Sequence, residues 1–142
     1  DSVMVESFLD GREFTCGVIP STPGGSPRFL PVTEIISDNA FFDYEAKYAG
    51  KSREVTPADI DVDLTSDIQE RAVTVYRDLD CSGMARVDFI LHEGVPHVVE
   101  VNTVPGFSEI SIIPQQAQVV GISPTELISL ILDDALMGLN RI

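Results

Sequence analysis

Two neighbouring segments with alternating polarity constrain the fold of this chain more than any other feature. Apolar and polar residues alternate along residues 84–91, and they alternate again along residues 97–102. This spacing is typical of strands with one buried face. The link between them is short and has Gly94 at its centre. We therefore expect an antiparallel hairpin.

The register of this hairpin decides which polar side chains meet. Arg86 and Asp88 share one face of the first strand. Glu100 and Asn102 share one face of the second. A three-residue loop would place Asp88 opposite Glu100, whereas a two-residue loop would pair Asp88 with Val99 and turn Glu100 to the other face. Only the first register brings the polar residues of both strands together.

Two opposed carboxylates would repel each other and raise each other's pKa unless a cation lay between them. The candidate ligands Asp88, Glu100 and Asn102 offer only oxygen atoms. Oxygen ligands favour Mg²⁺ over zinc, and Mg²⁺ usually takes one or two carboxylates together with substrate phosphates. The spacing alone fits equally well with an exposed hairpin face that carries ordinary surface acids.

Composition narrows the class of protein. The chain has 142 residues, of which 44% are hydrophobic, enough for the core of one domain. Its net charge of -14 argues against nucleic acid or an anionic membrane as a partner. Cys16 and Cys81 lack the spacing of a disulfide framework, so we expect two small buried residues in a reducing cytoplasm. The longest apolar stretch, around residues 127–132, is too short to span a bilayer.

Other patterns predict further strands before the hairpin. Residues 3–9 and 13–19 have strand-like composition, and the turn pair Asp10-Gly11 between them predicts an opening hairpin. The Pro-, Gly- and Ser-rich residues 20–27 form a loop, and residues 28–36 return to strand-like composition.

Three helices are also expected. Ser66 and Gln69 form a capping-box pattern, followed by apolar residues at helical spacing; they are Ile68, Ala72, Val75 and Leu79. A short helix over residues 114–120 should end at Gly121. The last helix should start at Ser123 as N-cap, with Pro124 in the first position and Glu126 completing the box.

Four runs, in the same order and spacing, carry a resemblance to the D-alanine–D-alanine ligase family of the ATP-grasp superfamily; they are residues 5–15, 42–48, 86–88 and 100–106. The resemblance implies an α+β fold, an ATP-grasp C-terminal domain with a mostly antiparallel sheet and flanking helices. It also implies that residues 1–142 are a fragment that lacks the N-terminal domain and most of the central domain. The abrupt start at Asp1 agrees with this expectation.

The activity implied by the resemblance is ATP-dependent, ADP-forming ligation of two D-alanines through an acyl phosphate. The product, D-alanyl-D-alanine, serves peptidoglycan synthesis and so cell wall biogenesis and cell shape. The implied cofactors are ATP and two Mg²⁺ ions, for which Mn²⁺ can substitute, and the full-length enzyme is expected to be a cytoplasmic homodimer. The fragment alone is expected to be inactive. Two alternatives stay open: another ATP-grasp ligase, such as a D-alanine–D-lactate ligase, and a non-catalytic folded module.

At the metal end, the resemblance assigns one Mg²⁺ to Asp88 and Glu100, with Glu100 bridging to a second ion that Asn102 also binds. Arg86 would stabilise the charge that develops on the reacting carboxyl group. Its alternative role is a salt bridge to Asp88 or Glu100. Gly106 would offer its backbone N–H to the same oxyanion, because a residue without Cβ allows close approach.

At the nucleotide end, Glu6 resembles the acid beside the adenine and Leu9 the residue whose backbone meets the base. Glu13 would accept hydrogen bonds from the ribose hydroxyls, Ile90 would contact the nucleotide, and Lys47 would bind phosphate. Taken singly, without the resemblance, Glu6 and Glu13 would be interpreted as surface acids on a hairpin.

The second substrate is assigned to residues of the loop regions. Ser111 falls where the family binds the carboxylate of the second D-alanine, with Ile112 beside it. Tyr48 would supply a catalytic hydroxyl in a lid over residues 41–48, and this Tyr goes with D-alanine rather than D-lactate as second substrate. Phe42 departs from the family, in which Tyr is common at that position.

Overall fold

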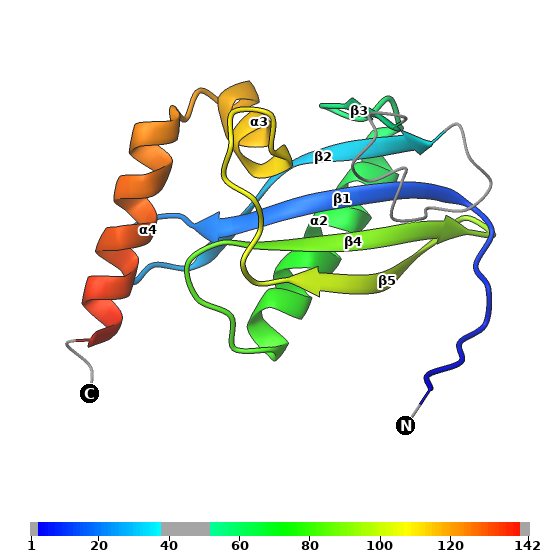
Figure 1. The fold of residues 1–142 in the computed structure, drawn as a ribbon, viewed down its shortest axis with the longest axis horizontal. Coiled ribbons are helices and arrows are strands. Elements are labelled where there is room, and N and C mark those ends of the chain that lie inside the picture. Colours follow the sequence, from blue (N-terminus) through cyan, green and yellow to red (C-terminus); the bar gives the residue numbers. More distant parts are fainter. Residues whose placement is uncertain (1–2, 38–51, 140–142) are drawn as a thin grey trace.

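The computed structural model describes residues 3–37 and 52–139 of the chain. Its strands form one five-stranded antiparallel sheet in the order β3-β2-β1-β4-β5 (Figure 1). The strands are β1 (Arg12–Pro20), β2 (Pro27–Ser37), β3 (Ser52–Val55), β4 (Ala85–His92) and β5 (Val95–Asn102). The helices are α2 (Val62–Asp78), α3 (Ile112–Val119) and α4 (Pro124–Leu139). The expected α+β fold with an antiparallel sheet and flanking helices is confirmed.

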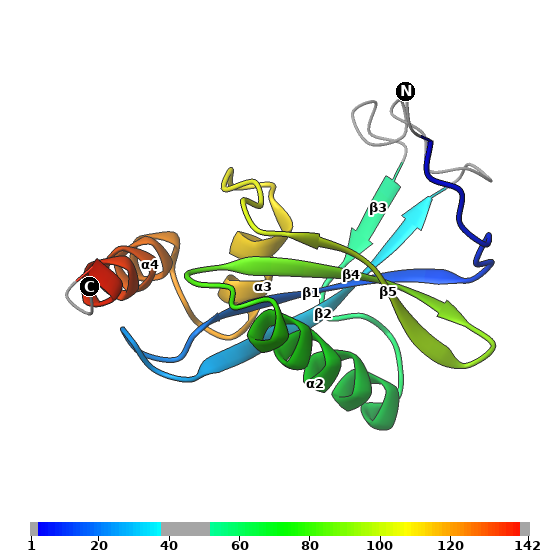
Figure 2. The same ribbon diagram turned by 90° about the horizontal axis from the view of Figure 1, so that it is seen from below.

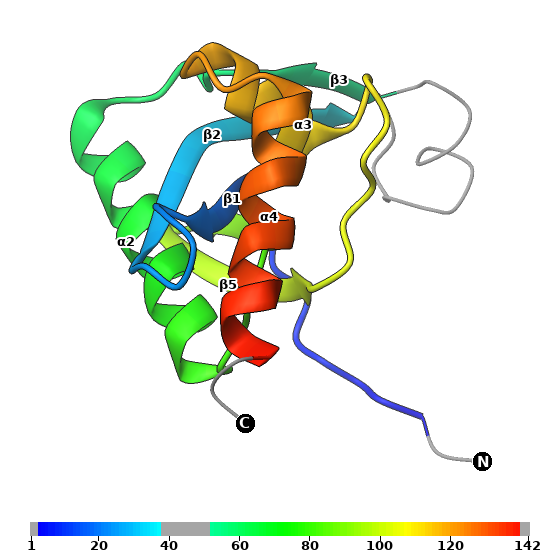
Figure 3. The same cartoon turned by 90° about the vertical axis from the view of Figure 1, so that its left-hand side faces the viewer.

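The helices pack on both faces of the sheet, but they leave part of one face uncovered. Helix α2 packs along one face, and α3 and α4 lie on the other (Figures 2 and 3). Alternate residues of β1 therefore enter different cores. Phe14, Cys16 and Val18 face α2, whereas Ile19 packs with residues of α3 and α4. The part of the second face that α3 and α4 leave uncovered includes β4 and β5, where the candidate site lies.

The predicted opening hairpin does not form. Residues 3–10 carry no strand, and the side chains of residues 3–8 are exposed. The physical reason is that β1 pairs with β2 on one side and with β4 on the other, so it has no free edge for a hairpin partner. The predicted strands over residues 13–19 and 28–36 are confirmed as β1 and β2.

Helix α2 begins one turn before the predicted capping box. Its N-cap is Asp61, whose side chain accepts a hydrogen bond of 2.8 Å from the backbone N–H of Leu64. Ser66 lies inside the helix, so its prediction as the N-cap is wrong. A carboxylate at the N-cap satisfies a free N–H and also interacts favourably with the helix dipole. The buried residues of this helix are Ile68, Ala72, Val73 and Tyr76, whereas Leu79 is exposed.

The two C-terminal helices agree with the predicted signals. Helix α3 begins at Ile112, two residues earlier than predicted, and Gly121 follows it with a φ of 79°. The capping box of α4 is confirmed: the Ser123 hydroxyl donates to Glu126 Oε2 at 2.6 Å, and the Ser123 N–H donates to the same atom at 2.8 Å. These hydrogen bonds lower the pKa of Glu126.

Both cysteines are free thiols, as expected. Cys16 is fully buried, and burial raises the pKa of its thiol to about 12. Cys81 is half-buried. No helix within residues 3–37 and 52–139 is long and apolar enough to cross a membrane.

Candidate active site

The β4–β5 hairpin turns through two residues, not three. His92 pairs with Val95, and Glu93 and Gly94 form the turn with φ values of 50° and 79°. Two positive φ values in succession are the signature of a type I′ turn, which suits a two-residue hairpin. The three-residue loop on which the site-forming register was based is therefore wrong.

A bulge in β5 nevertheless brings the two carboxylates together. Phe89 pairs with Val98 and Asp88 pairs with Glu100, so Val99 is an extra residue on β5. One extra residue reverses the alternation of side chains beyond it. The bulge thus compensates for the short loop and places Asp88 opposite Glu100.

The same face continues across three strands. On β4 and β5, Arg86 is opposite Asn102. On β1 and β4, Thr15 is opposite Asp88 and Glu13 is opposite Ile90. Six of the predicted site residues therefore lie on one face of the sheet; they are Glu13, Arg86, Asp88, Ile90, Glu100 and Asn102.

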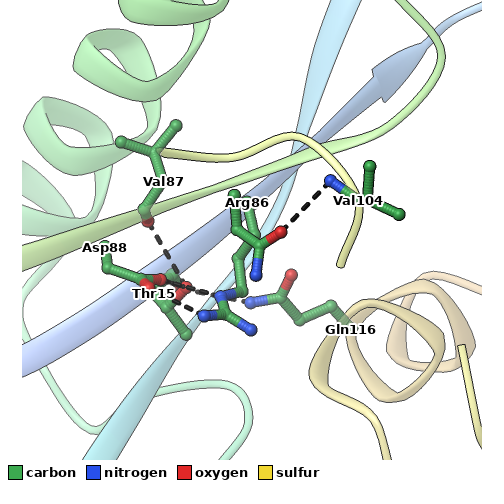
Figure 4. A network of polar contacts seen from close by, with 7 residues as sticks. Thr15, Arg86, Val87, Asp88, Val104 and Gln116 are labelled. Atoms are coloured by element: carbon green, nitrogen blue, oxygen red, sulfur yellow. Dashed lines mark hydrogen bonds and ion pairs between the residues drawn. The ribbon is translucent and has the colours of Figure 1, made fainter. Parts of the chain in front are cut away.

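Asp88 is buried, and two neighbouring side chains hold its carboxylate (Figure 4). Arg86 donates from Nε to Oδ1 and from Nη2 to Oδ2, both at 2.8 Å, and the Thr15 hydroxyl donates to Oδ1. These hydrogen bonds to Asp88 raise the pKa of Arg86, and the negative charges of Glu100 and Glu13 raise it further. The salt bridge that the sequence left as an alternative role for Arg86 is present.

The donor set of this face fits a hard cation. Asp88 and Glu100 supply opposed carboxylates, and Asn102 supplies an amide oxygen on the same strand. The N–H of Val104 donates to Asn102 Oδ1 at 3.1 Å, which orients this amide (Figure 4). No three His, Cys, Asp or Glu side chains converge anywhere in the described residues, and at this face an amide accompanies only two carboxylates. Two carboxylates and one amide leave room for the water and phosphate oxygens that Mg²⁺ prefers.

Three predicted nucleotide residues line one cavity of about 390 Å³. They are Glu6, Leu9 and Ile90, and the bulge residues Val98 and Val99 also line it. Small-molecule sites usually have about 300–1,000 Å³ and mostly apolar walls with a few polar groups. The cavity lies between the segment before β1 and the outer edge of the sheet, with Glu13 opposite Ile90.

The predicted residues Gly106 and Ser111 lie together. Between β5 and α3 the chain turns back, and Ser111 Oγ accepts a hydrogen bond of 3.0 Å from the N–H of Ser108. The hydroxyls of Ser108 and Ser111 are also 2.8 Å apart. A Cβ atom on Gly106 would come within 3.0 Å of Ser111 Oγ, so this position favours glycine. Ser111 is the N-cap of α3, and Ile112 is the first residue of that helix and is buried.

The predicted lid residues Phe42, Lys47 and Tyr48 lie outside the described residues. Thr15 and Gln116 contribute to the polar network of the site, although the sequence reasoning missed both. Alternation along β1 would have placed Thr15 on the face of Glu13. Gln116 is fully buried, and no local pattern distinguishes it from Gln115 and Gln118 of the same helix.

Comparison with known proteins identifies the family. The model of the D-ala D-ala ligase C-terminus family matches residues 1–133. Two curated D-alanine–D-alanine ligases are similar: that of Christiangramia forsetii is 51% identical over 136 residues, 96% of this chain and 41% of the relative. That of Flavobacterium johnsoniae is 48% identical over 127 residues, 89% of this chain and 39% of the relative. The chain thus spans about two fifths of the length of these relatives.

Solved structures agree with this match. A D-alanine–D-alanine ligase from Bacillus anthracis, complexed with ATP, has a TM-score of 0.77 and 31% identity, with 96% of this chain and 43% of that chain covered. The VanG D-Ala:D-Ser ligase from Enterococcus faecalis has a TM-score of 0.76 and 35% identity, with 89% and 37% covered. Because the family model covers nearly all of the sequence and the fold agrees with the solved ligases, this chain belongs to the D-alanine–D-alanine ligase family and matches its C-terminal part.

Proposed function

We propose that this chain supplies the C-terminal part of an ATP-dependent, ADP-forming ligase that joins two D-alanines. Family membership and the names of the relatives support the reaction. The observation that carries the proposal is the opposition of Asp88 and Glu100 beside Arg86 and Asn102, which the bulge at Val99 produces. The remaining length of such an enzyme would supply its N-terminal domain and most of its central domain.

The proposed reaction has two steps. The carboxylate of the first D-alanine attacks the γ-phosphorus of ATP, which gives an acyl phosphate and ADP. The amine of the second D-alanine then attacks the acyl carbon, loses a proton and expels inorganic phosphate to give D-alanyl-D-alanine. No covalent bond to the protein forms, so the protein contributes positioning and charge stabilisation. The product would serve peptidoglycan synthesis in the cytoplasm.

The metal would be held on the exposed face of β4 and β5. Asp88 and Glu100 would bind one Mg²⁺, and Glu100 would bridge to a second ion that Asn102 also binds; Mn²⁺ could replace either. Bound there, the ions would neutralise the phosphate charge and orient the transferred group. Asp88 Oδ1 already accepts from Thr15 and Arg86, whereas Oδ2 accepts one hydrogen bond. The remaining lone pair of Oδ2 is therefore the one that suits a metal.

Arg86 would stabilise the charge that develops on the reacting carboxyl group. Its Nε and Nη2 bind Asp88, whereas Nη1 makes no hydrogen bond to the described part of the chain. A guanidinium fixed by a carboxylate is a preorganised donor. Such a donor needs little reorganisation energy when the transition state forms. The backbone N–H of Gly106 would donate to the same oxygen.

The cavity beside β5 would receive the adenine. Glu6 and the backbone of Leu9 would meet the base, and Ile90 would pack against it. Glu13, next to Ile90 across the strand pair, would accept hydrogen bonds from the ribose hydroxyls. Lys47 would bind a phosphate.

The second D-alanine would bind where the loop meets α3. The Ser111 hydroxyl would bind its carboxylate, with Ile112 beside it, and Tyr48 would contribute a hydroxyl. A second candidate function is ligation of D-alanine to D-serine or D-lactate, because one similar structure is named a D-Ala:D-Ser ligase. A panel of D-alanine, D-serine and D-lactate as second substrates separates these functions.

The test is D-alanine-dependent phosphate release from Mg-ATP by the longest natural chain that contains this segment, with the 142-residue chain assayed beside it. We expect release from the long chain alone, lost when D-alanine is omitted, and we expect that chain to be a homodimer. Release by the 142-residue chain would contradict the proposal that it is an incomplete, inactive module. No release from either chain would exclude D-alanine as the substrate.

A further inference from the structure

Gln116 of α3 is a buried polar residue that joins α3 to the centre of the sheet. Its side chain is fully buried. Oε1 accepts a hydrogen bond of 3.0 Å from the backbone N–H of Gly17. Nε2 donates to the backbone oxygen of Thr15 at 3.1 Å (Figure 4). It also donates to Thr33 Oγ1 at 2.9 Å. The carboxamide thus uses its acceptor and both its donors.

The strand beneath Gln116 is shaped to receive this amide. The pairing of β1 with β2 shifts by one residue at Gly17, so the ladder between these strands is interrupted there. The N–H of Gly17 donates to Gln116 instead. A Cβ atom at Gly17 would be only 2.6 Å from Gln116 Oε1, so the missing side chain provides the space for the amide. Gly17 and Gln116 therefore fit each other across 99 residues of sequence.

The network continues from Gln116 to the proposed metal face, the side of β4 and β5 that carries Asp88, Glu100 and Asn102. The backbone of Thr15 accepts from Gln116, and the side chain of Thr15 donates to Asp88 Oδ1. Thr15 is fully buried, so this hydrogen bond is shielded from water. At the other end, Gln116 lies one helical turn after Ile112, the first residue of α3. Gln116 and Thr15 together thus connect the carboxylate of Asp88 with the start of α3.

We propose that Gln116 is a positioning residue that acts through Thr15 to fix Asp88 and the start of α3 relative to each other. This inference rests on the proposed function, because it assumes a metal at Asp88 and a substrate at Ser111. Gln116 itself touches neither. Partners that orient a metal ligand typically contribute about 10–100-fold to metal affinity or activity, and Gln116 would supply part of this through Thr15.

The experiment compares variants of the longest natural chain by titration with Mn²⁺, followed by electron paramagnetic resonance. Gln116→Met keeps the length of the side chain and removes all three hydrogen bonds. We expect about a tenfold or greater rise in the Mn²⁺ dissociation constant and a higher KM for the second D-alanine. The affinity for adenosine, measured without metal, should stay within about twofold of that of the unmodified chain. The residues that line the cavity around Glu6 and Leu9 do not belong to the Gln116 network.

Two controls separate positioning from stability. Gln118→Met makes the same change at an exposed position of the same helix and should leave the Mn²⁺ affinity unchanged. Leu127→Ala removes a fully buried side chain from the core beside α3 and should lower stability without changing the Mn²⁺ affinity of the folded protein. Equal loss of Mn²⁺ affinity in Leu127→Ala and Gln116→Met would overturn the inference.

A double variant tests the route through Thr15. Thr15→Val keeps the shape of the side chain and removes the hydroxyl that reaches Asp88. If Gln116 acts through Thr15, adding Gln116→Met to Thr15→Val should weaken Mn²⁺ binding little further, whereas independent effects would multiply. Multiplied effects would overturn the inference. Should Gln116→Met fail to fold, Gln116→Glu keeps the acceptor for Gly17 and is expected to weaken Mn²⁺ binding in the same way.

The outcomes also separate this inference from the proposed function. Mn²⁺ binding without dipeptide synthesis by the unmodified chain would reject the reaction alone, and the variants would still decide the role of Gln116. Absence of Mn²⁺ binding by the unmodified chain would overturn the metal assignment and the inference together.

Discussion

Arg86 and Asp88, two residues apart on β4, form a nearly buried ion pair through two hydrogen bonds of 2.8 Å. Their side chains are 14% and 8% exposed. Neighbouring residues of this type on one strand face usually point into water as separate charges. Here the guanidinium fixes the orientation of the carboxylate, and the Thr15 hydroxyl fixes it further. The metal face is therefore ordered by the chain's own side chains.

Removal of one partner of this pair should be strongly destabilising. Arg86→Met would leave the Asp88 charge buried with only Thr15 as a partner, and we expect a loss of about 3–5 kcal/mol in the free energy of unfolding. Urea unfolding of the 142-residue chain, followed by circular dichroism, measures it. Arg77→Met on the exposed side of α2 is the matched control. A loss below about 1 kcal/mol for Arg86→Met would show that the pair is not formed in solution.

Deletion of Val99 tests the bulge in β5. Without this residue, β5 has no bulge. The regular pairing that starts at the two-residue turn then continues past Val98 and places Glu100 directly opposite Asp88. We expect Mn²⁺ binding to persist, whereas adenosine binding should weaken because Val99 lines the cavity. Insertion of one glycine between Val98 and Val99 should instead turn Glu100 away and abolish Mn²⁺ binding. The opposite pattern in the two variants would contradict the observed register.

The start of α2 can be tested by two substitutions. Asp61→Ala removes the side chain that accepts from Leu64, and we expect a loss of about 1 kcal/mol in the free energy of unfolding. Ser66→Ala lies inside the helix and should change stability by less than about 0.5 kcal/mol. Urea unfolding of both variants provides the comparison, and a larger effect for Ser66→Ala would restore the start that the sequence pattern suggested.

The buried thiol of Cys16 predicts a loss of stability in alkali. Its pKa is raised from 9.0 to about 12 by burial, so the folded protein keeps the thiol neutral while the unfolded chain ionises it. The contribution is fully present below pH 9.0 and is lost as the pH rises towards 12. Cys16→Ala should make the decline of stability between these pH values shallower. Tyr76, whose pKa burial also raises to about 12, should keep part of the decline. An unchanged slope in Cys16→Ala would contradict the burial of this thiol.

The sequence predicted the residues of the metal face better than it predicted their geometry. Alternation is a local property, and it placed Arg86 with Asp88 and Glu100 with Asn102 correctly. The two-residue loop turns Glu100 away from Asp88, and the bulge at Val99 turns it back. No local sequence pattern around Val99 predicts this bulge. Loop length alone therefore does not determine the register of this hairpin.

Errors elsewhere arose from competition between equally good local signals. Asp61 and Ser66 are both favourable N-caps, and only packing of α2 on the sheet selects the earlier one. The composition of residues 3–9 suits a strand, but both edges of β1 are taken by β2 and β4. Gln116 meets Gly17 from 99 residues away, a relationship that becomes visible only in the folded chain. Nonlocal pairing decided each of these cases.

Asp88 and Glu100 are proposed to hold the metal of an ATP-dependent ligase, and Glu100→Gln tests this assignment. The substitution keeps the size of the side chain and removes the charge that would bridge two Mg²⁺ ions. In the longest natural chain, we expect D-alanine-dependent phosphate release from Mg-ATP to fall by at least about 100-fold, with weaker Mn²⁺ binding. Glu93→Gln, at the exposed turn of the same hairpin, should release phosphate at the unmodified rate. Unmodified turnover by Glu100→Gln would contradict the assignment of Glu100 as a metal ligand.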